Sequence, residues 1–196
     1  MDPETKNKLI LLHAALMVFV WMLAVPVAMG MNMLARKKGK TWGPKVHMLI
    51  MTTAGFVPFT ISAFIAFGIS GQLKLKPHSG IGTALSIGVW SQVMLGTVNH
   101  LLFRYRRKHH CLPPKRPWNN HVHIWLGRLL LFMALINIPL GMRIKKATMP
   151  LYILYGIWLL VLAIAFLWLA FLSEKKQDTV EPDKEVEKMA INEAKA

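Results

Sequence analysis

Five apolar stretches of membrane-spanning length dominate this chain of 196 residues. About 20 helical residues are needed to cross the roughly 30 Å hydrocarbon core of a bilayer, and each stretch reaches that length. A helix satisfies all its backbone polar groups internally, so it is the form in which a single segment crosses lipid. We therefore predict an all-α membrane protein with five transmembrane helices near residues 9–34, 46–70, 79–103, 122–142 and 150–172.

One membrane domain, residues 9–172, is expected to account for most of the chain, with a short N-terminal segment at 1–8 and a charged tail at 173–196. Lys6 and Lys8 precede the first apolar stretch in the manner of a signal peptide. That stretch is longer than the apolar region of a signal peptide and contains a histidine, so we expect it to be retained. Cleavage is the alternative, and it would remove His13.

Acidic residues are absent from the whole of the predicted membrane domain. All nine lie either at Asp2 and Glu4 or from Glu174 onward, so residues 5 to 173 contain no carboxylate. Such a core cannot perform acid/base catalysis with paired carboxylates, and it lacks the acidic relays of many ion pumps. These two classes of function are therefore disfavoured.

Basic residues give the chain a net charge of +15, but they gather in the loops between the apolar stretches. This pattern indicates membrane topology and not nucleic-acid binding. We call the side of the membrane that holds the N-terminus side A and the opposite side B. Eleven basic residues fall on side B and seven on side A, which predicts a cytoplasmic side B, an extracytoplasmic N-terminus and a cytoplasmic C-terminus. The eleven are Arg36, Lys37, Lys38, Lys40, Lys45, Arg104, Arg106, Arg107, Lys108, Lys115 and Arg116, and the seven are Lys6, Lys8, Lys74, Lys76, Arg143, Lys145 and Lys146.

A histidine lies near the beginning of each of the first four stretches: His13, His47, His78 and His123. Antiparallel helices start on alternating sides, so His13 and His78 are expected near side A, and His47 and His123 near side B. Two axial imidazoles in each layer are what a six-coordinate haem b requires. One histidine at a helix end is more often an interfacial residue, but four at matching depths favour two haems. A haem-free membrane scaffold remains the alternative.

Glycines follow two of these histidines at the same spacing. Gly82 lies four residues after His78, as Gly127 lies four residues after His123. Residues four apart share a helix face, and glycine permits a close approach. We predict that both glycines contact the porphyrin.

Three further residues are candidates near side B. His100 is a competing ligand, which we instead expect to contact a haem propionate or a ligand histidine. His121 lies about 160° from His123 around a helix, so the two cannot both ligate one iron. Arg128 has no carboxylate partner in the core, so a haem propionate is a predicted partner; extension toward lipid phosphate is the alternative.

Other polar residues receive simpler explanations. Gln92, Asn99 and Asn137 are expected to form hydrogen bonds between helices. Every fourth residue of the second stretch is small, which predicts close helix packing; this stripe comprises Ala54, Pro58, Ser62, Ala66 and Ser70. A metal site at His109, His110 and Cys111 is a weaker alternative to a solvated loop.

Four short motifs resemble the cytochrome b561 family, especially the fungal-type domains that often follow an extracellular DOMON module. They are LLHAALM around His13, KVHMLI around His47, PHSGIG around His78 and HVHIWLGR around His123. The resemblance spans residues 9 to about 172. It implies a bundle in which the first four helices hold two b haems, ligated by the first with the third and the second with the fourth histidine, and the fifth packs outside. No DOMON module precedes the first stretch here, which leads us to expect a stand-alone version, a fragment or a partner of a separate extracellular haem domain.

The expected function is transmembrane electron transfer between a cytoplasmic donor and an extracytoplasmic acceptor, each a small molecule or a protein. A terminal reductase, for example of ferric chelates, is a second hypothesis, with an acceptor site on side A near Lys74, Lys76, Arg143 and Lys145. Whether the chain is an enzyme is left open. The expected partners are the lipid bilayer and a second copy of the chain, and no nucleic acid.

Overall fold

The computed structural model describes residues 1–70, 76–113 and 115–172, and these form helices and connecting loops without strands. Two of the helical segments, η1 and η2, are π-helical, and both lie inside longer continuous helices. In chain order the elements are α1 (Pro3–Val18), η1 (Phe19–Ala24), α2 (Val25–Lys37), α3 (Gly43–Ile50), η2 (Met51–Phe56), α4 (Val57–Ser70), α5 (Pro77–Lys108), α6 (Trp118–Ile144) and α7 (Met149–Phe171).

Five continuous helices are long and apolar enough to cross a membrane: Pro3–Lys37, Gly43–Ser70, Pro77–Lys108, Trp118–Ile144 and Met149–Phe171. The prediction of an all-α membrane protein with five transmembrane helices is confirmed. Most of these helices extend beyond the apolar stretches at both ends. Hydropathy marks the segment that lies in hydrocarbon, whereas the helix continues into the polar interface, where charged side chains are tolerated.

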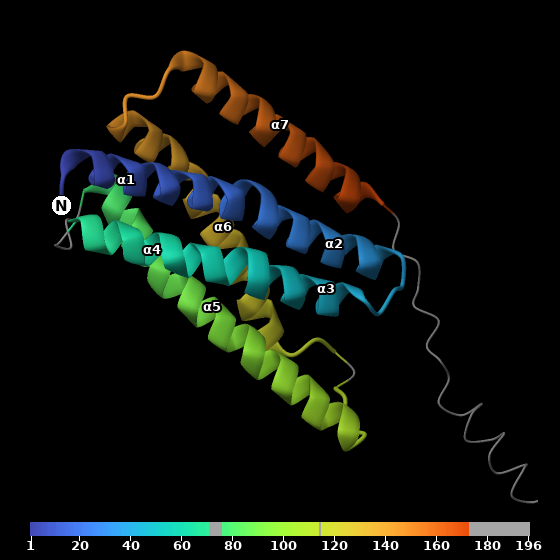
Figure 1. Cartoon of the computed structure of the whole chain (residues 1–196). Helices are drawn as coiled ribbons and strands as arrows, with labels where there is room; N and C mark the ends of the chain where they lie inside the picture. Colours follow the sequence, from blue (N-terminus) through green and yellow to red (C-terminus); the bar gives the residue numbers. More distant parts are fainter. Residues whose placement is uncertain (71–75, 114, 173–196) are drawn as a thin grey trace, which may run out of the picture.

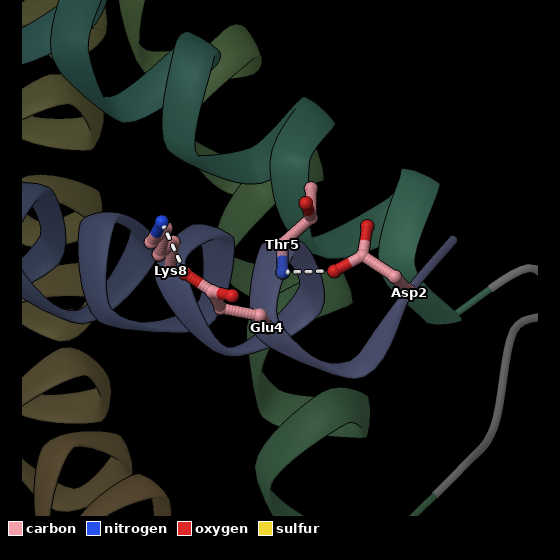
Figure 2. Close-up of polar contacts among 4 residues, drawn as sticks. All are labelled: Asp2, Glu4, Thr5 and Lys8. Carbon is pink, nitrogen blue, oxygen red and sulfur yellow. Dashed lines mark hydrogen bonds and ion pairs between the residues drawn. The ribbon is translucent and has the colours of Figure 1, made fainter.

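The first helix begins within the predicted N-terminal segment, at a capping residue. Asp2 Oδ1 accepts a hydrogen bond of 2.8 Å from the backbone N–H of Thr5, and Glu4 forms an ion pair of 2.6 Å with Lys8 one turn later (Figure 2). The bond from Thr5 lowers the pKa of the Asp2 carboxyl from its usual value. An acid at this position satisfies a free N–H group of the first turn.

Both π-helical segments end two residues before a proline. η1 precedes Pro26, and η2 precedes Pro58. Proline donates no backbone hydrogen bond, and its ring collides with the preceding turn. A π-bulge is one way for a helix to absorb this defect, and such bulges frequently occur at functional sites. Each bulge follows the histidine of its own helix by about one or two turns.

The first four spans form a bundle in which α1 packs on α4, α2 on α3, and α5 on α6 (Figure 1). Further contacts join α1 to α6 and α4 to α5. The helix bearing α1 and the helix α5 therefore stand at opposite corners of the bundle. The helix of α3 and α4 stands opposite α6 in the same way.

Helix α7 lies outside this bundle, alongside α2 (Figure 1). Trp158 Nε1 donates a hydrogen bond of 2.9 Å to the carbonyl of Met22, and the Tyr155 hydroxyl donates to the carbonyl of Leu135. Leu169 is buried, and its side chain contacts Gly30. The prediction of a peripheral fifth helix is confirmed.

Replacing Trp158 with phenylalanine should weaken the attachment of α7 by about 1 kcal/mol, because one partly buried hydrogen bond is lost while the aromatic volume is largely kept. The measurement is the free energy of unfolding in mixed detergent micelles. Trp168→Phe is the control, because Trp168 is 60% exposed. An equal loss in both variants would contradict a specific role for the Trp158 bond.

The core of the bundle lies at the middle of the helices. Its buried members come from every span of the four-helix core, and Trp21 meets Phe59 edge to face at 5.8 Å between ring centres. The cluster consists of Val20, Trp21, Val25, Phe59, Leu85, Leu130 and Ala134. Each of the four predicted ligands lies about two turns or more away from it along its own helix.

Candidate functional site

The two side-A histidines face each other across the bundle. The ring centres of His13 on α1 and His78 on α5 are 6.4 Å apart, with planes at 88°. Each Nδ1 is bonded to a backbone carbonyl of a neighbouring helix: His13 to Ser62 at 3.0 Å, and His78 to Asn137 at 3.1 Å. Because a carbonyl can only accept, Nδ1 carries the proton in each ring. Nε2 is therefore left unprotonated, and its lone pair is available to a metal ion.

The two side-B histidines repeat this arrangement. The ring centres of His47 on α3 and His123 on α6 are 6.5 Å apart, with planes at 83°. His47 Nδ1 donates to the carbonyl of Ala28 at 3.2 Å. His123 Nδ1 is buried and has no hydrogen-bond partner among the described residues, although Gln92 Nε2 donates to the His123 carbonyl at 2.7 Å.

The spacing within each pair suits a metal ion between two axial imidazoles. A metal–nitrogen bond of about 2 Å on each side, with about 1 Å from each nitrogen to its ring centre, separates the centres by about 6 Å. Both observed separations are close to this value. Haem needs only two protein ligands because the porphyrin supplies the other four, so a pair of imidazoles is a donor set that it can use. No group of three or more metal-ligating side chains occurs within the described ranges.

Helices α5 and α6 pack large side chains, including the His78 and His123 rings, against glycines of the opposite helix. A Cβ on Gly141 would lie 2.9 Å from His78 Cε1, and a Cβ on Gly96 would lie 3.2 Å from His123 Cε1. Gly127 makes room in the same way for Gln92, whose Nε2 would be 2.8 Å from the added carbon. Side chains at these glycines would displace the rings or separate the helices.

The same pattern occurs twice in the sequence of these two helices. The positions in α5 recur in α6 after 45 residues: His78, Gly82, Leu85, Gln92 and Gly96 correspond to His123, Gly127, Leu130, Asn137 and Gly141. Because the helices are antiparallel, the beginning of each copy meets the end of the other. The histidine of one copy thus packs on the last glycine of the other, once on each side of the membrane.

The remaining sequence-based candidates do not adjoin the four histidine rings in the contacts described above. A Cβ added to Gly82 would lie 3.7 Å from Asn137 Nδ2, and Gly127 adjoins Gln92. His100 and His121 are exposed. Arg128 is also exposed, with its guanidinium 4.9 Å from the ring centre of Trp125. Porphyrin or propionate contacts for Gly82, Gly127, Arg128 and His100 stay predictions.

The smaller expectations are partly confirmed. Gln92 and Asn99 bond across to α6, since Asn99 Nδ2 donates to the carbonyl of Asn119 at 3.4 Å. Ser62, in the small-residue stripe, is fully buried where α4 packs on α1. His109, His110 and Cys111 do not form a three-residue metal site among the described residues. Lys74 and the charged tail lie outside the described residues, so their predicted roles are untested.

Several functional residues escaped sequence reasoning. Ala28, Ser62, Gly96 and Gly141 each adjoin one of the four histidines that we predict to be ligands. The recurrence after 45 residues is the signal that could have identified the last glycine of each copy. The carbonyl partners had no comparable signal, because every residue type carries a carbonyl group.

The chain matches no protein-family model and no solved structure. It is 30% identical over 135 residues to a cytochrome b561 and DOMON domain-containing protein of Arabidopsis thaliana, and these residues make up 67% of this chain and 31% of that protein. The chain thus spans about a third of the length of this relative. The similarity supports a relationship to the cytochrome b561 family, the same family that the four histidine motifs resemble.

Proposed function

We propose that this membrane domain holds two b haems and carries electrons from one side of the membrane to the other. The observation that carries the proposal is the pair of facing imidazoles in each of two layers, with ring centres 6.4 and 6.5 Å apart. The name of the Arabidopsis relative, cytochrome b561, agrees with it.

His13 and His78 would hold the side-A haem, and His47 and His123 the side-B haem. The carbonyls of Ser62, Ala28 and Asn137 fix three of the four rings by accepting their Nδ1 protons. Bound in this way, haem supplies a site that gains and loses one electron at a time. The protein supplies the ligands, their orientation and a dry surrounding.

A cluster of packed apolar side chains lies between the two layers. His123 and Asn137, whose carbonyl bonds His78, are 14 residues apart on α6, which corresponds to about 21 Å of helix. The core cluster around Trp21 and Phe59 occupies the middle of this length. It excludes water between the layers, which lowers the local dielectric constant and limits the reorganisation that accompanies charge movement.

The loop charges support an orientation with side B in the cytoplasm. With this orientation, the proposed transfer runs outward, from a cytoplasmic donor to an extracytoplasmic acceptor. Outward movement of an electron across an inside-negative membrane gains about 2.3 kcal/mol per 100 mV. Basic loops on both sides favour anionic donors and acceptors. A separate DOMON protein is one candidate acceptor, because the Arabidopsis relative carries both names.

Sealed vesicles containing the purified protein test this proposal. We expect a haem absorption band, reduction of that band by a membrane-impermeant reductant on side B, and reduction of ferricyanide enclosed on side A. Protein without a haem band would favour a haem-free scaffold. Reduction by side-A reductants alone would contradict the direction. Turnover with ferric chelates that persists in the purified protein would favour the terminal reductase.

A further inference from the structure

The Ser62 side chain is fully buried. Its hydroxyl forms both of its described hydrogen bonds with one proposed ligand residue, His13. Its Oγ lies 2.9 Å from His13 Nδ1 and 3.1 Å from the His13 carbonyl, while its own carbonyl lies 3.0 Å from the same Nδ1. The hydroxyl must donate to the His13 carbonyl, which is an acceptor. Its oxygen is then free to accept from Nδ1, so the Nδ1 proton is shared between two oxygens of Ser62.

The corresponding position in the other layer has no hydroxyl. His13 is followed by His47 after 34 residues, and Ala28 is followed by Ser62 after the same interval. Each histidine bonds to a backbone carbonyl of the other span: His13 on the first span bonds to Ser62 on the second, and His47 on the second bonds to Ala28 on the first. Ala28 is as fully buried as Ser62, but it offers only its carbonyl, at 3.2 Å.

The second histidine of each layer adds to the difference between the layers in hydrogen-bond acceptors. His78 Nδ1 donates to the carbonyl of Asn137, whereas His123 Nδ1 has no partner within the described residues. Three protein oxygens therefore accept from the two ligand rings on side A: Ser62 O, Ser62 Oγ and Asn137 O. Among the described residues, one protein oxygen accepts from the ligand rings on side B, namely Ala28 O.

An acceptor on Nδ1–H draws the proton away from the ring and makes the opposite nitrogen a stronger electron donor to a metal. Stronger donation stabilises the ferric over the ferrous state, so the reduction potential falls. We propose that Ser62 is a positioning residue that orients His13 and lowers the reduction potential of the side-A haem below that of the side-B haem. This inference rests on the proposed function, because it presupposes a haem in each layer.

A redox titration of the purified protein, followed by haem absorbance, tests this inference. Ser62→Ala should shift the side-A midpoint to higher potential and leave the side-B midpoint unchanged. Ala28→Ser should shift only the side-B midpoint, to lower potential. The same substitutions in a His47→Ala background, which retains the side-A haem alone, assign each midpoint to its layer.

Ser62→Thr is the conservative control, because it keeps the hydroxyl and should keep the side-A midpoint. A purely structural role would lower haem content in Ser62→Ala without moving the midpoint of the haem that remains. If Ser62→Ala fails to hold the side-A haem, Ala28→Ser decides, because it adds the hydroxyl on the other side. Unchanged midpoints in protein with two haems would overturn the role of Ser62 alone, whereas wild-type protein without haem would overturn the proposed function itself.

Discussion

Replacing His13 or His78 with alanine should lower the haem content from about two per chain to about one, because a six-coordinate b haem loses one of its two protein ligands. His47→Ala and His123→Ala should have the same effect on the other haem. Under the proposed function, the pairs at 6.4 and 6.5 Å belong to two independent sites. The measurement is the ratio of haem to protein after purification.

Combining variants distinguishes the pairing. A double variant within one layer, His13→Ala with His78→Ala, should keep one haem, whereas His13→Ala with His47→Ala should keep none. His100→Ala and His121→Ala are matched controls. Both histidines are exposed, and they lie on α5 and α6, the helices that carry His78 and His123. Loss of a haem from His100→Ala would refute the assignment of the side-B ligands.

Valine at Gly141 should displace the His78 ring and remove the side-A haem, whereas valine at Gly96 should remove the side-B haem. A Cβ at Gly141 would lie only 2.9 Å from His78 Cε1, and the two outer carbons of valine would crowd the ring further. Overpacking of this kind typically costs about 1–3 kcal/mol where the structure cannot relax. We expect the haem ratio to fall to about one in each variant, with the other haem retained.

Gly156→Val provides the control, because a Cβ at Gly156 meets nothing within 4 Å. It makes the same change in helix propensity and adds the same volume on α7, so it should retain both haems. Full haem content in Gly141→Val would show that the glycine is not needed for the His78 ring. Loss of both haems in that variant would indicate general unfolding, and the residual helix content measured by circular dichroism separates that outcome from local displacement.

Much of the architecture was predictable from hydropathy. The apolar stretches determine where the chain lies in hydrocarbon, and a helix is the form in which a single segment satisfies its own backbone there. Alternation of helix direction then determines which histidines share a side. Both arguments need only sequence spacing, so His13 with His78, and His47 with His123, could be named before any contact was known. Helix ends such as Lys37 and Lys108 were underestimated, because charged residues continue a helix into the interface without any hydropathy signal.

The environment of each ring could not be predicted in this way. Gly82 and Gly127 drew attention because they share a face with a histidine, but the glycines that adjoin the rings of His78 and His123 are Gly141 and Gly96. They belong to the opposite helix, so their role depends on the antiparallel register between α5 and α6. Register is set by how large and small side chains interlock along the whole interface. The recurrence after 45 residues can therefore mark these two glycines, but it does not by itself place them against the rings.

The sequence by itself determined the number of spans, their alternation, the lack of carboxylates in the membrane and the four histidines at matching depths. These properties depend on hydropathy and spacing along one chain. The tertiary structure alone decided that opposite corners of the bundle bring the rings together in pairs and that Ser62 and Ala28 occupy equivalent positions with different chemistry. It also decided that His123 Nδ1 has no hydrogen-bond partner among the described residues. These depend on side chains and carbonyl groups from different helices meeting at a few ångströms, which only the packing of the bundle establishes.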